Sequence, residues 1–263
     1  YQQSNNTGAA ATFAKLLAGR KIHNDALTPY SPRTANLNTQ DTVDLVDALK
    51  GLFHDDKAVS KQYREGQMGR TAGYDFMENT IWPSHPRSGA NGAYLTNGAT
   101  QTGATLNVDT GATAPVQGDI FTIAGVNKVH PETKASLGIL QQFVVGSGAT
   151  TTVWPISPAI VATGATQNVS NSAADNSAIT IAGTASTNHG ISMLYHEEGF
   201  ALATADLIIP RGVDFSAREV FDGISMRIVR AYDINNDKFP CRLDILYGFK
   251  TIRPQLAVRL ANN

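Results

Sequence analysis

Apolar residues recur at helical spacing near the start of the chain. Across residues 7–24, Phe13, Leu16 and Ile22 lie at or near intervals of one turn, and alanine fills several of the gaps. This pattern predicts a helix, with Thr7 placed to cap its N-terminus. Pro29 follows, and its fixed backbone angle and missing N–H prevent the helix from continuing through it.

A second helical pattern covers residues 39–53. Val43 and Leu49 belong to its apolar stripe, and acidic side chains occupy its early turns. Negative charge there is favoured by the helix dipole, and either Asn38 or Thr39 suits the N-cap position. The first part of the chain therefore predicts two helices separated by a proline-containing connection.

The pattern changes after Pro86. From Ser88 to His189 the chain is rich in Gly, Ala, Thr, Ser and Asn, and helical periodicity almost disappears. Repeated Gly-Ala-Thr triplets indicate turns that lead into extended chain. Short strands with frequent turns predict a small barrel or sandwich. The strands are expected at residues 105–108, 119–126, 141–145, 151–156, 159–162 and 178–182.

Alternating apolar and polar residues return toward the C-terminus. Residues 193–207 and 226–232 predict strands, and residues 242–260 predict one or two long strands that bend at Pro254. Asn-Asn-Asp at residues 235–237 indicates a hairpin turn between two of them.

Composition and charge narrow the function without identifying it. Charged residues make up 16% of the chain and its net charge is −1. This charge balance does not indicate nucleic-acid binding at the level of the whole chain. Cys241 has no second cysteine to pair with, and is interpreted as a strand residue. No apolar run approaches the roughly 18 residues of a membrane span. Lys57, Lys61 and Arg64 are spaced so that they would share one face of a helix, and such a face is interpreted as solvated in preference to phosphate-binding.

Several longer motifs follow one another along the chain. Leu-Thr-Pro-Tyr-Ser-Pro-Arg-Thr-Ala-Asn begins at Leu27, and Gly-Arg-Thr-Ala-Gly-Tyr-Asp-Phe begins at Gly69. Gly-Asp-Ile-Phe-Thr-Ile-Ala-Gly-Val begins at Gly118, and Gln-Gln-Phe-Val-Val follows it. Leu-Tyr-His-Glu-Glu-Gly-Phe begins at Leu194, and Leu-Tyr-Gly-Phe-Lys-Thr-Ile-Arg-Pro begins at Leu246. In this order the motifs resemble the major capsid (coat) proteins of tailed double-stranded DNA phages, in the family typified by the short-tailed Salmonella phage.

The resemblance implies an α+β fold of the Hong Kong 97-like (Johnson) capsid type with an inserted β-barrel domain. Residues 1–87 would then form part of the axial domain with two helices, and residues 88–189 the inserted Gly/Thr-rich barrel. Residues 190–263 would complete the axial and peripheral domains. The N-terminal arm, extended loop and spine helix of such proteins are expected to be absent from this chain, which begins at Tyr1.

The function implied by the resemblance is structural. The chain would be a major capsid protein, not an enzyme, that self-assembles as pentamers and hexamers into the icosahedral shell around phage DNA. Scaffolding and portal proteins are the expected assembly partners, with double-stranded DNA inside the shell bound without sequence specificity and no membrane involved. The expected location is the virion, after assembly in the host cytoplasm. No catalytic, cofactor-binding or metal-binding residues are expected.

Five charged residues near Pro210 and Gly212 are the candidate contacts between subunits. The region is predicted to be a loop, and charges on it could pair across subunits and set register and partner choice. An ordinary solvated loop is equally compatible with the sequence. The residues are Asp206, Arg211, Asp214, Arg218 and Glu219.

The residues alone leave two other functions open. A tail or decoration protein of a virion would share the Thr/Gly-rich middle, but would not need the two helices. A metal-dependent hydrolase would use His189, His196 and Glu198. The motif His-Glu-x-x-His is missing, and a strand here would place His196 and Glu198 on one face with Glu197 on the other. His85, between two prolines, is predicted to lie in a loop.

Overall fold

The structure is a computed structural model that describes residues 3–5, 9–49, 68–90 and 93–262. The chain divides into two compact units. Unit 1 consists of Tyr1–Glu197 with Pro254–Asn263, and unit 2 is Glu198–Arg253. Lys57, Lys61 and Arg64, the basic residues predicted to share a helical face, lie outside the described residues.

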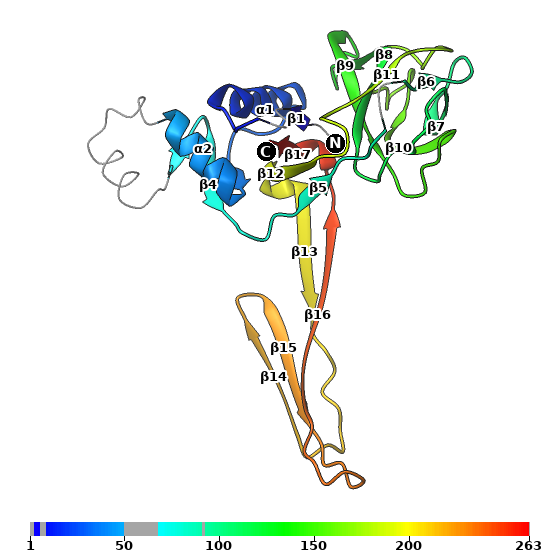
Figure 1. Ribbon diagram of the computed structural model, residues 1–263. Helices are drawn as coiled ribbons and strands as arrows, with labels where there is room; N and C mark the ends of the chain where they lie inside the picture. The colour runs from blue at the N-terminus through cyan, green and yellow to red at the C-terminus, as the bar shows by residue number, and fades with distance from the viewer. Residues whose placement is uncertain (1–2, 6–8, 50–67, 91–92, 263) are drawn as a thin grey trace. The chain divides into compact units, whose positions relative to one another are not determined.

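Unit 1 contains a seven-stranded mixed sheet built from segments far apart in the sequence (Figure 1). Its order is β1-β17-β12-β2-β4-β3, and β5 pairs with β12. Leu194, on β12, pairs with Val258 on one side and with Ala35 on the other. The strands are β1 (Gln3–Asn5), β2 (Arg33–Leu37), β3 (Arg70–Thr71), β4 (Tyr74–Glu78), β5 (Ser84–Pro86), β12 (Asn188–His196) and β17 (Ala257–Ala261).

Helix α1 (Phe13–Asp25) packs closely on this sheet. Its N-cap is Thr12, whose hydroxyl oxygen accepts a hydrogen bond from the backbone N–H of Lys15 at 3.4 Å. Residue 7, the predicted cap, lies outside the described residues. A Cβ added to Gly19 would lie 2.6 Å from Cδ1 of Leu194, so the helix can approach the sheet this closely because that position has no side chain.

Helix α2 (Thr39–Leu49) begins where the sequence predicts. The Asn38 side-chain oxygen accepts a hydrogen bond from the N–H of Asp41 at 2.7 Å, as an N-cap should. The predicted apolar stripe is partly wrong, because Val43 is 62% exposed while Asp41, Leu45 and Leu49 are buried. The last residues of the predicted helix, 50–53, lie outside the described residues.

The core of the mixed sheet contains a buried histidine. His23 of α1 is fully buried, and its Nδ1 lies 2.7 Å from the hydroxyl oxygen of Tyr74. Burial, with the positive charge of Arg33 as the next cause, lowers the pKa of His23 to about 3. The apolar residues buried around this region are Ala11, Leu16, Ala35, Leu37, Leu45, Leu49, Met68, Tyr74, Leu194, Val258 and Leu260.

This histidine makes the stability of unit 1 depend on pH. Its pKa is lower in the folded than in the unfolded state, so its contribution is complete above an unfolded-state pKa of about 6.5 and is lost as the pH falls. We expect the free energy of unfolding to drop by up to about 1.4 kcal/mol per pH unit below that value. Urea unfolding at several pH values should show a shallower slope of unfolding free energy against pH for His23→Leu than for the parent protein. An unchanged slope in His23→Leu would contradict the assignment.

The second part of unit 1 is an antiparallel sheet that closes into a barrel. Its order is β11-β8-β9-β10-β7-β6, and a bridge from Leu95 of β6 to Ala178, the residue before β11, closes the sheet. The strands are β6 (Leu95–Thr96), β7 (Gly103–Asp109), β8 (Ile120–Val129), β9 (Ser136–Val145), β10 (Val153–Ile160) and β11 (Ile179–Ile181). Five of the observed strands overlap the six predicted ones. The predicted strands at 151–156 and 159–162 are one strand, β10, with an irregular register between Pro155 and Ile160.

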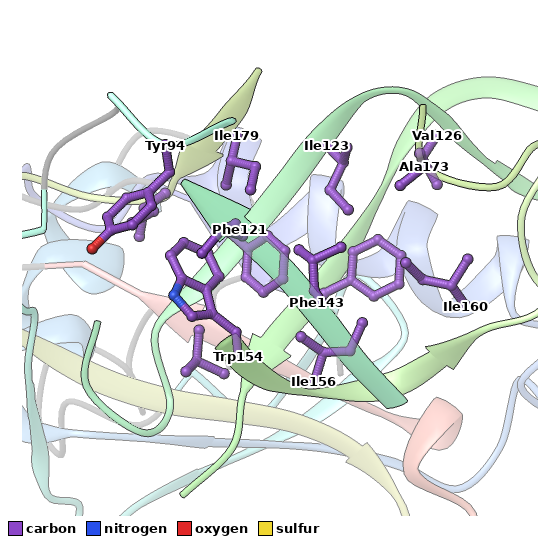
Figure 2. Close-up of a cluster of buried hydrophobic side chains, with 14 of the residues drawn as sticks. Tyr94, Phe121, Ile123, Val126, Phe143, Trp154, Ile156, Ile160, Ala173 and Ile179 are labelled. Atoms are coloured by element: carbon purple, nitrogen blue, oxygen red, sulfur yellow. The ribbon is translucent and has the colours of Figure 1, made fainter. Parts of the chain in front are cut away.

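Aromatic side chains fill the barrel interior (Figure 2). The ring of Trp154 meets those of Tyr94 and Phe121 edge-on, with centroid distances of 4.7 and 5.2 Å. Phe121 stacks on Phe143 at 5.7 Å. Gly111 lies against Tyr94, where an added Cβ would come within 1.9 Å of the ring. The barrel therefore has a packed core of its own.

Unit 2 is a four-stranded antiparallel sheet of order β13-β16-β15-β14 (Figure 1). The strands are β13 (Phe200–Ala205), β14 (Phe215–Phe221), β15 (Ile224–Arg230) and β16 (Cys241–Thr251). Cys241 begins β16, which confirms that it is a strand residue. A turn at 234–237 connects β15 to β16, as predicted for residues 235–237.

Three predictions about this part of the chain need correction. The strand predicted at 193–207 is interrupted, because β12 ends at His196 and a short 3-10 helix, Glu197–Gly199, precedes β13. The predicted alternation of Glu197 and Glu198 is therefore wrong. The predicted loop ends before Phe215, so Arg218 and Glu219 lie on β14. The long C-terminal segment does bend at Pro254, where the 3-10 helix Pro254–Leu256 separates β16 from β17.

Among the described residues, no helix has both the length and the apolar character needed to cross a membrane.

Candidate functional site

The sheet of unit 2 has two chemically different faces. Cross-strand pairs align Ala217, Ile228 and Leu243 on one face, and Arg218, Arg227 and Asp244 on the other. Side chains alternate between the two faces of the sheet along each strand. These pairs therefore show on which face each neighbouring side chain lies. The first surface, here called the apolar face, carries Phe215, Phe221, Ile224, Met226, Ile228, Leu243, Ile245, Tyr247, Phe249, Phe200 and Leu202.

The apolar face is open in the subunit. Phe221 and Phe249 are 82% and 81% exposed, and Leu243 is 65% exposed. A sheet normally buries one apolar face against another layer, because the apolar area that it hides from water supplies much of its stability. Large contiguous exposed apolar surfaces mark interaction sites. The apolar face thus has the composition of a surface that another protein layer covers.

The opposite, charged face is held by ion pairs between strands. Arg227 of β15 donates to Asp244 of β16 through Nη2 at 2.5 Å, and Arg242 lies 2.7 Å from the same carboxylate. Hydrogen bonds from Arg242 first, and then from Arg227, hold the pKa of Asp244 below its usual value. The sequence alone does not reveal this group of charges, because only the strand register brings Arg227 and Asp244 opposite each other.

The five predicted contact residues fall in different settings. Arg218 lies 3.4 Å from Asp206, and Arg230 lies 2.7 Å from Asp214, so two of the predicted acids make ion pairs within unit 2. Arg211 lies exposed on the connection between β13 and β14. Glu219 projects from the apolar face beside Met226. The structure thus pairs Asp206 with Arg218 and leaves the five residues distributed over both faces and the connection.

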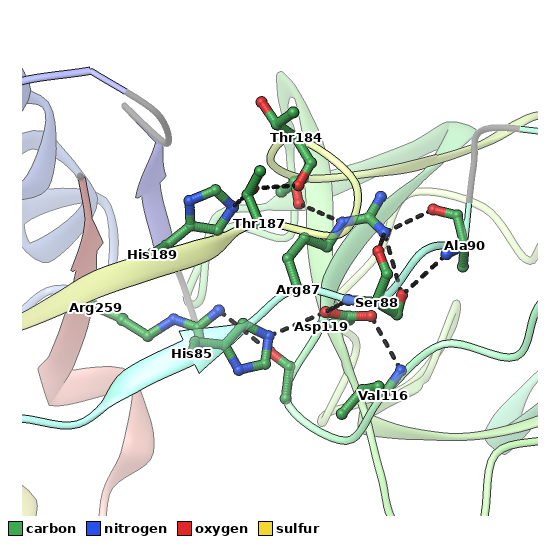
Figure 3. Close-up of polar contacts among 12 residues, drawn as sticks. His85, Arg87, Ser88, Ala90, Val116, Asp119, Thr184, Thr187, His189 and Arg259 are labelled. Carbon is green, nitrogen blue, oxygen red and sulfur yellow. Dashed lines mark hydrogen bonds and ion pairs between the residues drawn. The ribbon is translucent and has the colours of Figure 1, made fainter.

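A second polar cluster lies in unit 1, where the barrel meets the mixed sheet (Figure 3). The residues that form this polar junction are His85, Arg87, Asp119, His189 and Arg259. His85 lies on β5 and pairs with His189 of β12, so its predicted placement in a loop is wrong. The guanidinium group of Arg259, on β17, donates to the carbonyl of Gly118 at 3.1 Å.

Asp119 is the centre of the polar junction. Its side chain is fully buried, with Oδ1 3.0 Å from Nε2 of His85 and Oδ2 accepting from the N–H of Val116 at 3.0 Å. Burial raises its pKa, but hydrogen bonds, chiefly from His85, and the charge of Arg87 outweigh that effect, and its pKa is below the usual value. Burial lowers the pKa of Arg259 to about 10, and the charge of Asp119 opposes this.

Arg87 ties the start of the barrel segment to its end. It donates through Nε to the carbonyl of Ala182 at 3.1 Å, and through Nη1 to the carbonyls of Ser88 and Ala90 at 2.5 and 2.6 Å. All three acceptors are neutral, and Asp119 is the negative charge that acts on this buried guanidinium. The polar junction therefore connects the two points at which the chain passes between the mixed sheet and the barrel.

The three residues that a metal-dependent hydrolase would use have different contact partners. Nε2 of His189 lies 3.3 Å from the Thr187 hydroxyl, and Nε2 of His196 lies 3.3 Å from the carbonyl oxygen of Ser31. Glu198 lies in unit 2, where its carboxylate is 3.5 Å from Arg253. Among the described residues, no group of three or more His, Cys, Asp or Glu side chains is arranged to hold a metal ion.

Comparison with known proteins decides between these possibilities. A family model described as "P22 coat protein - gene protein 5" matches residues 28–261. The chain belongs to the P22 coat protein family. Members of this family are structural, so the chain is a capsid protein that assembles into the virion shell, and it is not an enzyme. The family match does not favour the tail, decoration or hydrolase alternatives.

A solved structure of a related domain is also similar to part of this coat protein. The I-domain of the CUS-3 coat protein is 30% identical to it, over 36% of this chain and 98% of the I-domain chain, with a TM-score of 0.29. No curated protein sequence matches.

Proposed function

We propose that this coat protein forms an icosahedral shell around phage double-stranded DNA and has a Hong Kong 97-like fold. In this interpretation the mixed sheet of unit 1 belongs to the axial domain, the closed barrel is an insertion, and unit 2 belongs to the peripheral domain. Rings of five and six copies close the shell through heterologous contacts. Scaffolding and portal proteins would take part in assembly in the host cytoplasm, and the DNA would be enclosed without sequence-specific contacts.

The observation that supports this proposal best is the apolar face of unit 2. Its proposed occupant is another copy of the same chain, because coat proteins of this family assemble with themselves. Exposed aromatic side chains such as Phe221 and Phe249 are residues that frequently dominate binding energy at protein interfaces. Many such contacts in one shell would add up through multivalency.

The charged residues next to this face would set the register of neighbouring copies. Four of these residues are at least partly exposed, so their charges act on a neighbouring copy as well as within unit 2. They are Asp206, Arg211, Asp214 and Arg218. Rim charges mainly affect encounter rate and choice of partner. The proposed role of these residues, with Glu219 on the apolar face, is therefore orientation of the contact more than its strength.

Replacing Phe249 by serine should block assembly while leaving the subunit folded. The side chain is 81% exposed, so unfolding stability should change by no more than about 0.5 kcal/mol. If the side chain is an interface hot spot, each contact should weaken by about 2–4 kcal/mol, and shells should give way to free subunits. Electron microscopy and sedimentation of the variant measure this directly.

The matched control is Ile81→Ser, since Ile81 is 83% exposed but belongs to unit 1. The control should assemble like the parent protein. Normal shells from Phe249→Ser, or an equal loss of shells in both variants, would rule out a specific role for the apolar face.

The proposed division into domains has its own test. Residues 88–189 contain the whole closed barrel and its aromatic core. We expect this segment to fold when expressed alone, because its strands pair with one another and bury the core between them. A dispersed amide spectrum would support the proposed domain boundaries, and a collapsed one would contradict them.

A further inference from the structure

A cavity of about 340 Å³ lies in unit 1, between the barrel and the C-terminal end of α1. Ala26 and Pro254 line one side, and Lys128, Lys134, Gln141 and Gln167 contribute to the barrel side. This volume is within the range of small-molecule sites. The polar junction lies elsewhere, around Asp119, and shares none of these lining residues.

Lys128 is the unusual residue of this cavity. It lies on β8 with 8% of its surface exposed, and its Nζ has no hydrogen-bond partner among the described residues. An ammonium group has three N–H donors and is costly to bury without acceptors. Buried charges in proteins are normally paired, so this one points to a missing acceptor.

The charges around Lys128 leave the cavity positive. Asp25 of α1 acts on Lys128 and raises its pKa, but the Asp25 carboxylate already lies 2.7 Å from Nζ of Lys21. Lys134 adds a second ammonium group, which donates to the carbonyl of Gln167 at 3.3 Å. Glu132, in the same turn as Lys134, is exposed.

Lys128 keeps most of its charge at neutral pH. Burial, opposed by Asp25 and helped by Lys21, lowers the pKa of Lys128 to about 8. A group with that pKa is still largely protonated at pH 7. A negative group that entered the cavity would therefore lie near a buried ammonium for which the described residues provide no acceptor.

We propose that this cavity binds a carboxylate, with Lys128 as its principal partner and Lys134 as a second positive charge. Several walls are apolar, including Val129, Pro131 and Pro254, and suit the aliphatic stem that carries a carboxylate. Two sources have this chemistry: a free short-chain carboxylate, or an acidic side chain of another copy in the shell.

The first experiment uses free subunits and glutarate. The side-chain signal of Lys128 in lysine-labelled protein, assigned by its loss in Lys128→Met, is followed by NMR during a pH titration. Glutarate should move the titration midpoint of Lys128 upward by about one pH unit relative to chloride at equal ionic strength, which corresponds to tenfold tighter binding to the protonated amine. The signal of Lys238, which is exposed and follows the turn at 234–237 of unit 2, should not respond to glutarate.

The second experiment compares subunits with assembled shells in the absence of glutarate. The rate of acetylation of Lys128 is measured by mass spectrometry over a range of pH. Simple occlusion by a neighbour would slow the reaction equally at every pH, whereas a neighbouring carboxylate would move the midpoint upward by about one unit.

The combined outcomes separate the two sources. A midpoint raised by assembly identifies an acidic side chain of a neighbouring copy. A midpoint raised by glutarate but not by assembly identifies a free carboxylate. If neither glutarate nor assembly moves the Lys128 midpoint, the proposed site does not exist, whatever the outcome for the apolar face of unit 2.

Discussion

Trp154→Ala should lower the free energy of unfolding of the barrel by about 3–5 kcal/mol, the usual cost of emptying a buried tryptophan site. Trp154 is fully buried and touches the rings of Tyr94 and Phe121. Its indole N–H donates to the carbonyl of Thr150 at 3.0 Å. The variant would leave a void between two aromatic rings, which the surrounding strands can close only partly, and an acceptor that loses its donor.

Hydrogen exchange measured on peptides from residues 103–160 would detect this loss without relying on tryptophan fluorescence. Val153→Ala is the matched control, because Val153 precedes Trp154 on β10 but is 38% exposed. The control should change barrel stability by less than about 1 kcal/mol. Similar exchange in the parent and in Trp154→Ala would show that the barrel core does not depend on this contact.

Asp119→Ala should destabilise unit 1 by about 3–5 kcal/mol, because it removes the negative charge from a buried group of oppositely charged side chains. The variant leaves the buried Arg87 and the half-buried Arg259 without the carboxylate that acts on both guanidinium groups. It also removes the acceptor of His85 and of the Val116 N–H. Loss of this group should loosen the barrel at its connection to the mixed sheet.

Two further variants separate charge from shape at this position. Asp119→Asn keeps the shape and removes the charge, so it should lose a large part of the same stability. Glu132→Ala removes an exposed carboxylate of the barrel and should be nearly neutral. Urea unfolding measures all three variants, and a neutral Asp119→Ala would disprove the role given to the junction.

The same carboxylate predicts a pH dependence. The pKa of Asp119 is lower in the folded state, so its contribution is complete above an unfolded-state pKa of about 3.9 and is lost as the pH falls further. In Asp119→Ala this acidic loss should disappear, while the loss that begins near pH 6.5 because of His23 should remain.

Local pattern was sufficient for much of the secondary structure. Five strands of the barrel were predictable because glycine-rich turns separate short apolar runs, such as the one at Phe121, whereas the two-residue strand β6 was missed. The start of α2 was predictable because Asn38 caps it through a bond three residues away. Strand β14 was missed because its charges, Arg218 and Glu219, together with the preceding Pro210 and Gly212, suggested a loop.

Local sequence pattern does not specify how strands far apart in the chain pair with one another. Arg227 and Asp244 form their ion pair only because β15 and β16 have the observed register. His85 and Asp119 are 34 residues apart and meet where the barrel joins the sheet. The ammonium of Lys128, which is buried and has no hydrogen-bond partner among the described residues, could not be inferred either, because the strand predicted at 119–126 ends before it and its burial depends on tertiary contacts.

Residue type and short-range spacing predicted the two helices and five of the barrel strands, and the order of the longer motifs along the chain gave the resemblance to the coat-protein family. Three features became visible in the folded protein alone: the charges that are buried together, the exposed apolar face of unit 2, and the cavity at Lys128. The physical reason is that burial and electrostatic environment are set by contacts between segments far apart in the chain, and strand register, which sequence periodicity does not specify, determines those contacts.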